Sequence, residues 1–223
     1  KANMKTATDF SQNIKKQLTN TLYVVSVDGH TNVLYMNAIT GECNLVFDTR
    51  IAIDNVMIKY HNTIENDDMA ILEFNYLGHN HKEVLLRNGE RVSEDYDNVD
   101  MFYSITDISE NLFAYFRGEE SNVIDRFGTN KFERYHNQSG IITNVSDMIN
   151  HKNIIICWRY PCDGSFAYNI YDIETNKFIL DKDVEMIIPT KGCIDADTFG
   201  FVVIKDNIVT NDDECYMIDT HNN

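Results

Sequence analysis

Long hydrophobic runs are missing from this sequence. The longest apolar stretches are short, such as residues 154–158, and none approaches the roughly 20 residues of a membrane-spanning helix. No basic and then apolar leader opens the printed chain, so neither a signal peptide nor insertion into a membrane is expected. Proline is also scarce, at 2 residues, which excludes a Pro-rich linker protein.

Basic side chains are few relative to acidic ones. The chain carries 35 acidic and 19 basic residues, which gives a formal net charge of −16 at pH 7. This charge repels phosphate groups at long range, so nucleic acid and anionic membrane surfaces are not expected as partners. The expected partner is a protein.

Cysteine usage does not indicate a disulfide framework. The number of cysteines is odd and their spacing is wide. This usage favours a cytoplasmic location. Cys157 and Cys162 form a C-x4-C pair, but a zinc site of this kind normally needs a second pair. Cys157 is better interpreted as a small buried residue on a strand.

The sequence does contain an internal repeat. Glycine and asparagine, which tolerate the positive φ of tight turns, recur in two series. The first series of turns is predicted at Gly29, Gly78, Gly118, Gly164 and Asn207, and the second at Gly41, Gly89, Gly128, Asn176 and Asn222. The repeat units are predicted at residues 9–50, 51–99, 100–139, 140–184 and 185–223, within a single domain covering residues 1–223.

Short β-rich runs around these turns predict four antiparallel strands in each unit. First strands are predicted at residues 56–60, 101–105, 141–145 and 186–188, and second strands at 22–27, 69–74, 112–116, 154–160 and 199–204. Third strands are predicted at residues 33–36, 84–86, 123–124, 168–171 and 216–218, and fourth strands at 44–47, 91–96, 131–135 and 177–180. The fourth strands are the most polar, as expected for an edge that faces water.

Units of this kind resemble the blades of a β-propeller. The stretches YMNAITGE (35–42) and YDIETNKF (171–178) resemble the end of strand three in WD40-like blades, and NVIDRFGTNKF (122–132) resembles a WG repeat. The resemblance implies an all-β chain of about five four-stranded blades, or part of a larger propeller. The propeller is expected to be irregular, because the Gly-His and Trp-Asp pairs of WD40 repeats are missing.

The N-terminal segment leaves two alternatives open. Residues 9–16 are interpreted either as the first strand of unit one or, over residues 9–18, as a helix with Phe10, Ile14 and Leu18 on one face. If residues 1–8 close a ring, they are expected to pair with residues 216–218 as the missing outer strand.

Two segments are the candidate partner-binding sites. The stretch CWRYPCDGSFAY contains Trp158, Arg159 and Tyr160, and Trp, Arg and Tyr are common at binding hot spots. The alternative is that Trp158 fills a gap between blades. The acidic stretch SEDYDNVD contributes Asp95, Asp97 and Asp100, which are interpreted either as partner contacts or as a solvated loop.

The sequence favours a non-catalytic scaffold or binding module for protein–protein interaction over an enzyme. No catalytic motif, metal-ligand set or cofactor-binding motif is evident; His79 and His81 form an H-x-H pair without an evident third ligand. The alternative function is a five-bladed glycosidase-like hydrolase with acidic residues at the top of a central funnel. Such an enzyme needs paired carboxylates, and the predicted first strands contain no Asp or Glu.

Overall fold

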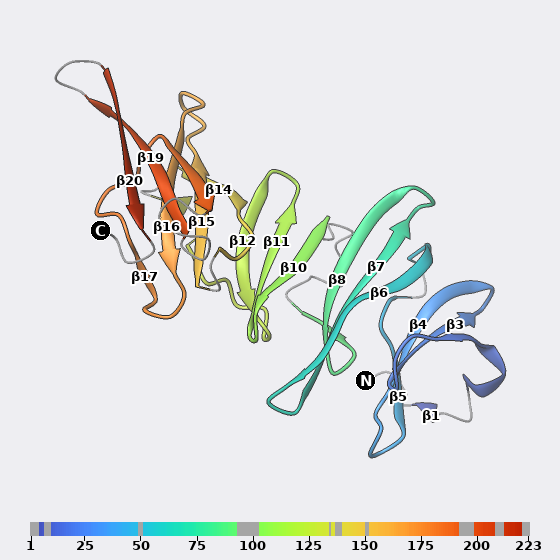
Figure 1. Ribbon diagram of the computed structural model, residues 1–223. Coiled ribbons are helices and arrows are strands. Elements are labelled where there is room, and N and C mark those ends of the chain that lie inside the picture. Colours follow the sequence, from blue (N-terminus) through green and yellow to red (C-terminus); the bar gives the residue numbers. More distant parts are fainter. Residues whose placement is uncertain are drawn as a thin grey trace. The chain divides into compact units, whose positions relative to one another are not determined.

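The fold consists of short antiparallel strands with almost no helix (Figure 1). The computed structural model describes residues 5–6, 10–48, 51–92, 103–133, 135–136, 140–149, 152–191, 199–207 and 212–219. Over these residues, helical structure is limited to Phe10 and one 3-10 turn, η1 (Ser11–Asn13). No helix in the described part of the chain is long and apolar enough to cross a membrane. The prediction of an all-β chain is confirmed.

The chain divides into two compact units. The first comprises Lys1–Phe113 with Ile124–Thr129, and the second comprises Ala114–Val123 with Asn130–Asn223. The sheets follow one another along the sequence, and each is built from one continuous stretch of chain. The boundaries of the repeat units and the single domain stay predictions.

The first sheet has the strand order β1-β5-β4-β3-β2. Its strands are β1 (Lys5–Thr6), β2 (Ile14–Gln17), β3 (Leu22–Val27), β4 (His30–Met36) and β5 (Glu42–Leu45). All its pairs are antiparallel, with Val24 opposite Val33 and Leu34 opposite Leu45. Strand β4 buries four consecutive residues, whereas β2 is exposed at every position.

The N-terminal segment differs from both alternatives drawn from the sequence. The helix over residues 9–18 is wrong, because the backbone becomes extended at Ile14 and continues as β2. The strand predicted over residues 9–16 begins only at Ile14. Strand β1 pairs with β5, with Lys5 opposite Cys43, so the expected pairing with residues 216–218 is wrong for Lys5 and Thr6. Pairing within one sheet closes a much shorter loop and therefore costs less chain entropy.

The second sheet has four strands in sequence order. They are β6 (Ile53–Ile64), β7 (Asp67–Tyr76), β8 (Asn80–Arg87) and β9 (Glu90–Arg91). The third sheet consists of β10 (Ser104–Ser109), β11 (Leu112–Arg117) and β12 (Glu120–Asp125).

The fourth strand predicted for the third unit, at residues 131–135, is wrong. The N–H of Lys131 still donates to the carbonyl of Val123 at 2.7 Å, but the chain then leaves this sheet. The Phe132 ring packs against Tyr171 of the next sheet, with 4.8 Å between ring centroids, and Tyr135–His136 pairs there with residues 140–141. Aromatic packing of this kind adds to the burial of the ring, and it explains why the chain turns away.

The fourth sheet is again five-stranded, in the order β13-β14-β15-β16-β17. Its strands are β13 (Tyr135–His136), β14 (Gly140–Val145), β15 (Asn153–Arg159), β16 (Phe166–Asp172) and β17 (Lys177–Phe178). The fifth sheet consists of β18 (Met186–Lys191), β19 (Phe199–Asn207) and β20 (Asp212–Asp219).

The turn residues behave largely as the repeat predicts. Positive φ angles occur at Gly29, Gly78, Gly118 and Gly164 in the first series and at Gly41, Gly89, Gly128 and Asn176 in the second. Asn207 is the last residue of β19 and pairs with Asp212 of β20, so the turn predicted here falls next to Asn207, on residues outside the described ones. Asn222 lies outside the described residues.

In three sheets a buried asparagine on β4, β12 or β16 bonds a segment that follows later in the chain. The Asn32 Oδ1 atom accepts hydrogen bonds from the N–H groups of Val33 (2.8 Å) and Phe47 (3.2 Å), and its Nδ2 donates to the carbonyl of Phe47 (2.9 Å). We call this three-bond arrangement the asparagine bridge. It recurs at Asn122 with Val123 and Phe132, and at Asn169 with Ile170 and Leu180. It satisfies backbone groups where the ladder of the sheet ends.

Candidate functional site

The acidic candidate residues Asp95, Asp97 and Asp100 lie outside the described residues. Their role as partner contacts stays a prediction.

The stretch CWRYPCDGSFAY (157–168), which contains Trp158, begins in the last residues of β15. Trp158 is 3% exposed, and its ring packs against Phe178 of the same sheet, with 5.7 Å between ring centroids. Arg159 is exposed and Tyr160 is half-buried. Burial, and then the nearby Asp183 carboxylate, raise the pKa of Tyr160 above its ordinary value. The burial of Trp158 favours a packing role, while a contact of Arg159 and Tyr160 with a partner stays a prediction.

The first strands are more acidic than the sequence suggested. Strand β6 begins at Ile53 and therefore includes Asp54, and β10 runs to Ser109 and includes Asp107. The expectation that the first strands contain no Asp or Glu is wrong, because β6 extends beyond the predicted residues 56–60 and β10 lies further along the chain than the predicted residues 101–105.

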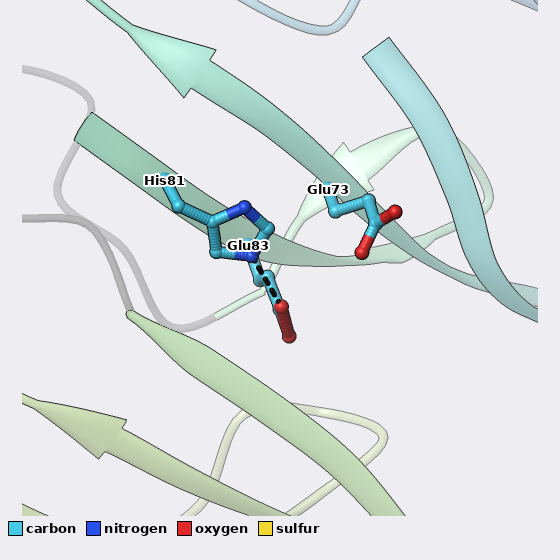
Figure 2. Close-up of side chains that lie close together, drawn as sticks. All are labelled: Glu73, His81 and Glu83. Carbon is cyan, nitrogen blue, oxygen red and sulfur yellow. Dashed lines mark hydrogen bonds and ion pairs between the residues drawn. The ribbon is translucent and has the colours of Figure 1, made fainter. Parts of the chain in front are cut away.

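One cluster of potential metal ligands occurs in the described part of the chain (Figure 2). His81 and Glu83 are two residues apart on β8, so their side chains emerge on the same face. Glu73 lies on β7, directly opposite Glu83 in the strand register. One donor atom from each of the three residues lies within 4.8 Å of the others. The His81 Nε2 atom is 2.8 Å from Glu83 Oε2.

Glu83 is the fixed member of this cluster. Its side chain is 4% exposed, whereas the His81 side chain is 53% exposed. Its Oε1 atom accepts a hydrogen bond from Lys59 Nζ at 2.6 Å and another from the N–H of Ile105 at 2.9 Å. The carboxylate is therefore buried with its charge compensated, and Oε2 is directed towards His81.

Glu83 also interrupts the repeat of the asparagine bridge. It stands immediately before the buried Val84, which is the place that Asn32 occupies before Val33. A carboxylate cannot donate a hydrogen bond as the Asn32 amide does. In addition, Glu83 faces Glu73 across the ladder, and like charges directly opposite one another destabilise a sheet. A substitution of this kind, against the local rules of the fold, is typical of a functional site.

A second cluster surrounds an exposed phenylalanine in the turn after β12. Phe127 is 53% exposed, and two guanidinium groups lie close to its ring. The distance from the ring centroid to the guanidinium carbon is 4.6 Å for Arg87 and 4.4 Å for Arg126. Both distances are within the range of a cation–π contact. We call these three residues the Arg–Phe–Arg stack.

Carboxylates hold both arginines of the stack in place. Asp67 Oδ2 accepts hydrogen bonds from Arg87 Nε at 2.8 Å and from Arg126 Nε at 2.9 Å. Arg126 donates further to Glu65 Oε2 at 2.7 Å and to Asn111 Oδ1 at 3.0 Å. The hydrogen bond from Arg87 is the largest cause that lowers the pKa of Asp67 below its ordinary value.

An amide-rich hollow lies between the first two sheets. Its lining includes Asn37, Asn44 and Asn88. Asn37 Oδ1 accepts from the backbone of its own turn, and Asn44 Nδ2 donates to the carbonyl of Gly89 at 3.3 Å. Asn88 bonds the backbone N–H of Asp68 and the carboxylate of Asp67. These amides close turns, so the hollow is a consequence of the fold and not a separate site.

Comparisons with known proteins do not assign the chain to a family. No family model matches it, and no curated protein matches it. Among solved structures, the chain is similar to the crystal structure of the tricorn protease, at 14% sequence identity and with a TM-score of 0.34. The match covers 92% of this chain and 21% of that chain, so this chain spans about a fifth of the length of that protein.

Proposed function

We propose that this chain is a non-catalytic binding module of the β-propeller type that recognises a protein partner. Its repeated antiparallel sheets, whose strands are joined by tight turns at regular intervals, support the propeller arrangement. Rigid sheets that carry short turns are a suitable support for recognition. The observation that carries the binding proposal is the exposure of Phe127, whose ring contacts the guanidinium groups of Arg87 and Arg126.

The Arg–Phe–Arg stack has the properties of a preformed anchor. Aromatic residues and arginine are enriched in the buried centre of protein interfaces. The Arg126 side chain is only 11% exposed and is held by three hydrogen bonds, so little side-chain entropy remains to be lost on binding. A partner that covers Phe127 therefore buries apolar surface while little side-chain conformational entropy is lost.

The same geometry defines the chemistry of the partner. The Phe127 ring requires an apolar pocket that replaces water around its exposed half. The Arg87 side chain is 37% exposed, and only its Nε atom is bonded to Asp67. Its terminal N–H groups can donate to carbonyl or carboxylate oxygens. The proposed partner surface is an apolar pocket with such acceptors on its rim.

Replacing Phe127 by alanine is expected to weaken partner binding strongly and leave the fold intact. An interface hot spot contributes 2 kcal/mol or more, which corresponds to a loss of affinity of about 30-fold. The melting temperature should change little, because Phe127 is mainly exposed. The purified chain and its variants are used as bait in extracts of the native cells, and the affinity is then measured with the purified partner.

The matched control is Phe166→Ala. Phe166 is a phenylalanine of similar exposure, at 49%, and lies at the start of β16. This variant should bind the partner with the wild-type affinity. Retention of the partner by Phe127→Ala, or equal losses in both variants, would show that the Arg–Phe–Arg stack is not the binding site.

A further inference from the structure

We infer that Glu73, His81 and Glu83 form a binding site for a divalent transition-metal ion of the Zn²⁺ class. The site is distinct from the Arg–Phe–Arg stack, and it uses only His81 of the H-x-H pair, together with two glutamates. One imidazole and two carboxylates are a donor set that Zn²⁺ accepts.

The geometry is close to what such an ion requires. Donor atoms around a tetrahedral Zn²⁺ lie about 2.1 Å from the ion, and hence about 3.4 Å from one another. The present separation of His81 Nε2 and Glu83 Oε2 is 2.8 Å, and all three donors lie within 4.8 Å of one another. Figure 2 shows that the three side chains come from two neighbouring strands. Small rotations of the exposed His81 and of Glu73 are sufficient to surround an ion.

The surroundings of Glu83 are those of an oriented metal ligand. Lys59 and the N–H of Ile105 bond only Oε1, so Oε2 remains directed towards the proposed ion. Metal-binding carboxylates are commonly held by hydrogen bonds of this type, which fix the orientation of the ligand. Among the described residues, the side chain of Glu73 makes no hydrogen bond or ion pair, so its carboxylate is available as a ligand.

The donor set also defines which ions are excluded. Ca²⁺ takes six to eight oxygen ligands, and Mg²⁺ prefers oxygen ligands in octahedral geometry. The imidazole of His81 suits neither ion. The ammonium group of Lys59 reduces the net negative charge at the site. This further disfavours Ca²⁺ and Mg²⁺, which are bound mainly by electrostatic attraction to oxygen ligands.

Binding is tested by titrating the metal-free full chain with Zn²⁺ in a calorimeter and with Co²⁺ in a visible spectrometer. We expect one ion per chain and an intense Co²⁺ absorption band from low-symmetry coordination. Either His81→Ala or Glu73→Gln should weaken the affinity at least tenfold. Glu73→Gln is isosteric and removes a group without partners among the described residues, so it should leave the fold intact. Ca²⁺ should not compete.

The control is His79→Ala, which removes the other histidine of the H-x-H pair. His79 is exposed and does not belong to the cluster, so this variant should bind Zn²⁺ as the wild type does. Three results would each overturn the inference: no binding of Zn²⁺ at about 100 μM, wild-type affinity in both His81→Ala and Glu73→Gln, or an equal loss in His79→Ala.

Discussion

Replacing Gly89 by alanine is expected to lower the free energy of unfolding by about 4 kcal/mol. Gly89 closes the turn between β8 and β9 with a φ of +78°, a conformation that costs an L-residue about 1 kcal/mol or more. A methyl group at this position would also overlap the Cγ, Cβ and Cδ1 atoms of Tyr35. Tyr35 is 8% exposed and belongs to the core of the first two sheets, and the backbone fixes its Cβ atom, so rotation of the ring cannot relieve the overlap. Urea unfolding of the two proteins measures the difference.

Gly78→Ala separates the two causes of the expected loss of stability, the backbone conformation and the overlap with Tyr35. Gly78 has a similar φ of +85°, but an added methyl group would meet nothing within 4 Å. This variant should lose only the backbone contribution, about 1 kcal/mol. In a Tyr35→Gly background, which also removes the overlapping Cβ atom, the additional cost of Gly89→Ala should fall to the same value. An equal loss in Gly89→Ala and Gly78→Ala would contradict the close packing of the first two sheets at this turn.

Asn32→Ala is expected to lower the free energy of unfolding by about 3 kcal/mol, because the asparagine bridge leaves buried backbone groups without partners when its side chain is removed. Asn32 is 2% exposed and bonds both the N–H and the carbonyl of Phe47. Phe47 is itself a core residue, and its ring packs edge-on against Phe74 at 5.0 Å between centroids. The loss is measured by chemical unfolding.

Two variants test the cause of this loss. Asn80→Ala replaces an exposed asparagine on β8 and should change the stability by about 0.5 kcal/mol at most. Asn32→Leu restores apolar volume but not the hydrogen bonds. If Asn32→Leu were as stable as the wild type, the contribution of Asn32 would be packing, and the asparagine bridge would have no role in stability.

The strands and turns of the first four units were largely predictable from local chemistry. A glycine determines the turn in which it lies, and residues with high β-propensity determine the strands on either side of it, so both signals are local. The predicted range of β3, residues 22–27, is therefore the observed one. The ends of strands were less predictable, because the polar residues His30 and Asn80 extend β4 and β8 through backbone pairing alone.

Long-range features of the site were not predictable in the same way. The sequence shows that His81 and Glu83 share a face, but Glu73 is 8 residues before His81 and joins them only through the register of the hairpin. Arg126 is 59 residues from Asp67, and no local pattern indicates that ion pair. One signal was present in the sequence: Asn precedes Val or Ile at residues 32, 122 and 169, and Glu83 stands in that place in the second unit.

The proposed function includes the hypothesis that the repeated sheets form a β-propeller. Small-angle X-ray scattering of the purified monomeric chain tests this claim most directly. A compact domain of 223 residues should have a radius of gyration of about 17 Å and a single symmetric peak in its distance distribution. A clearly larger radius, with the long tail typical of separate or linearly arranged bodies, would contradict the propeller arrangement.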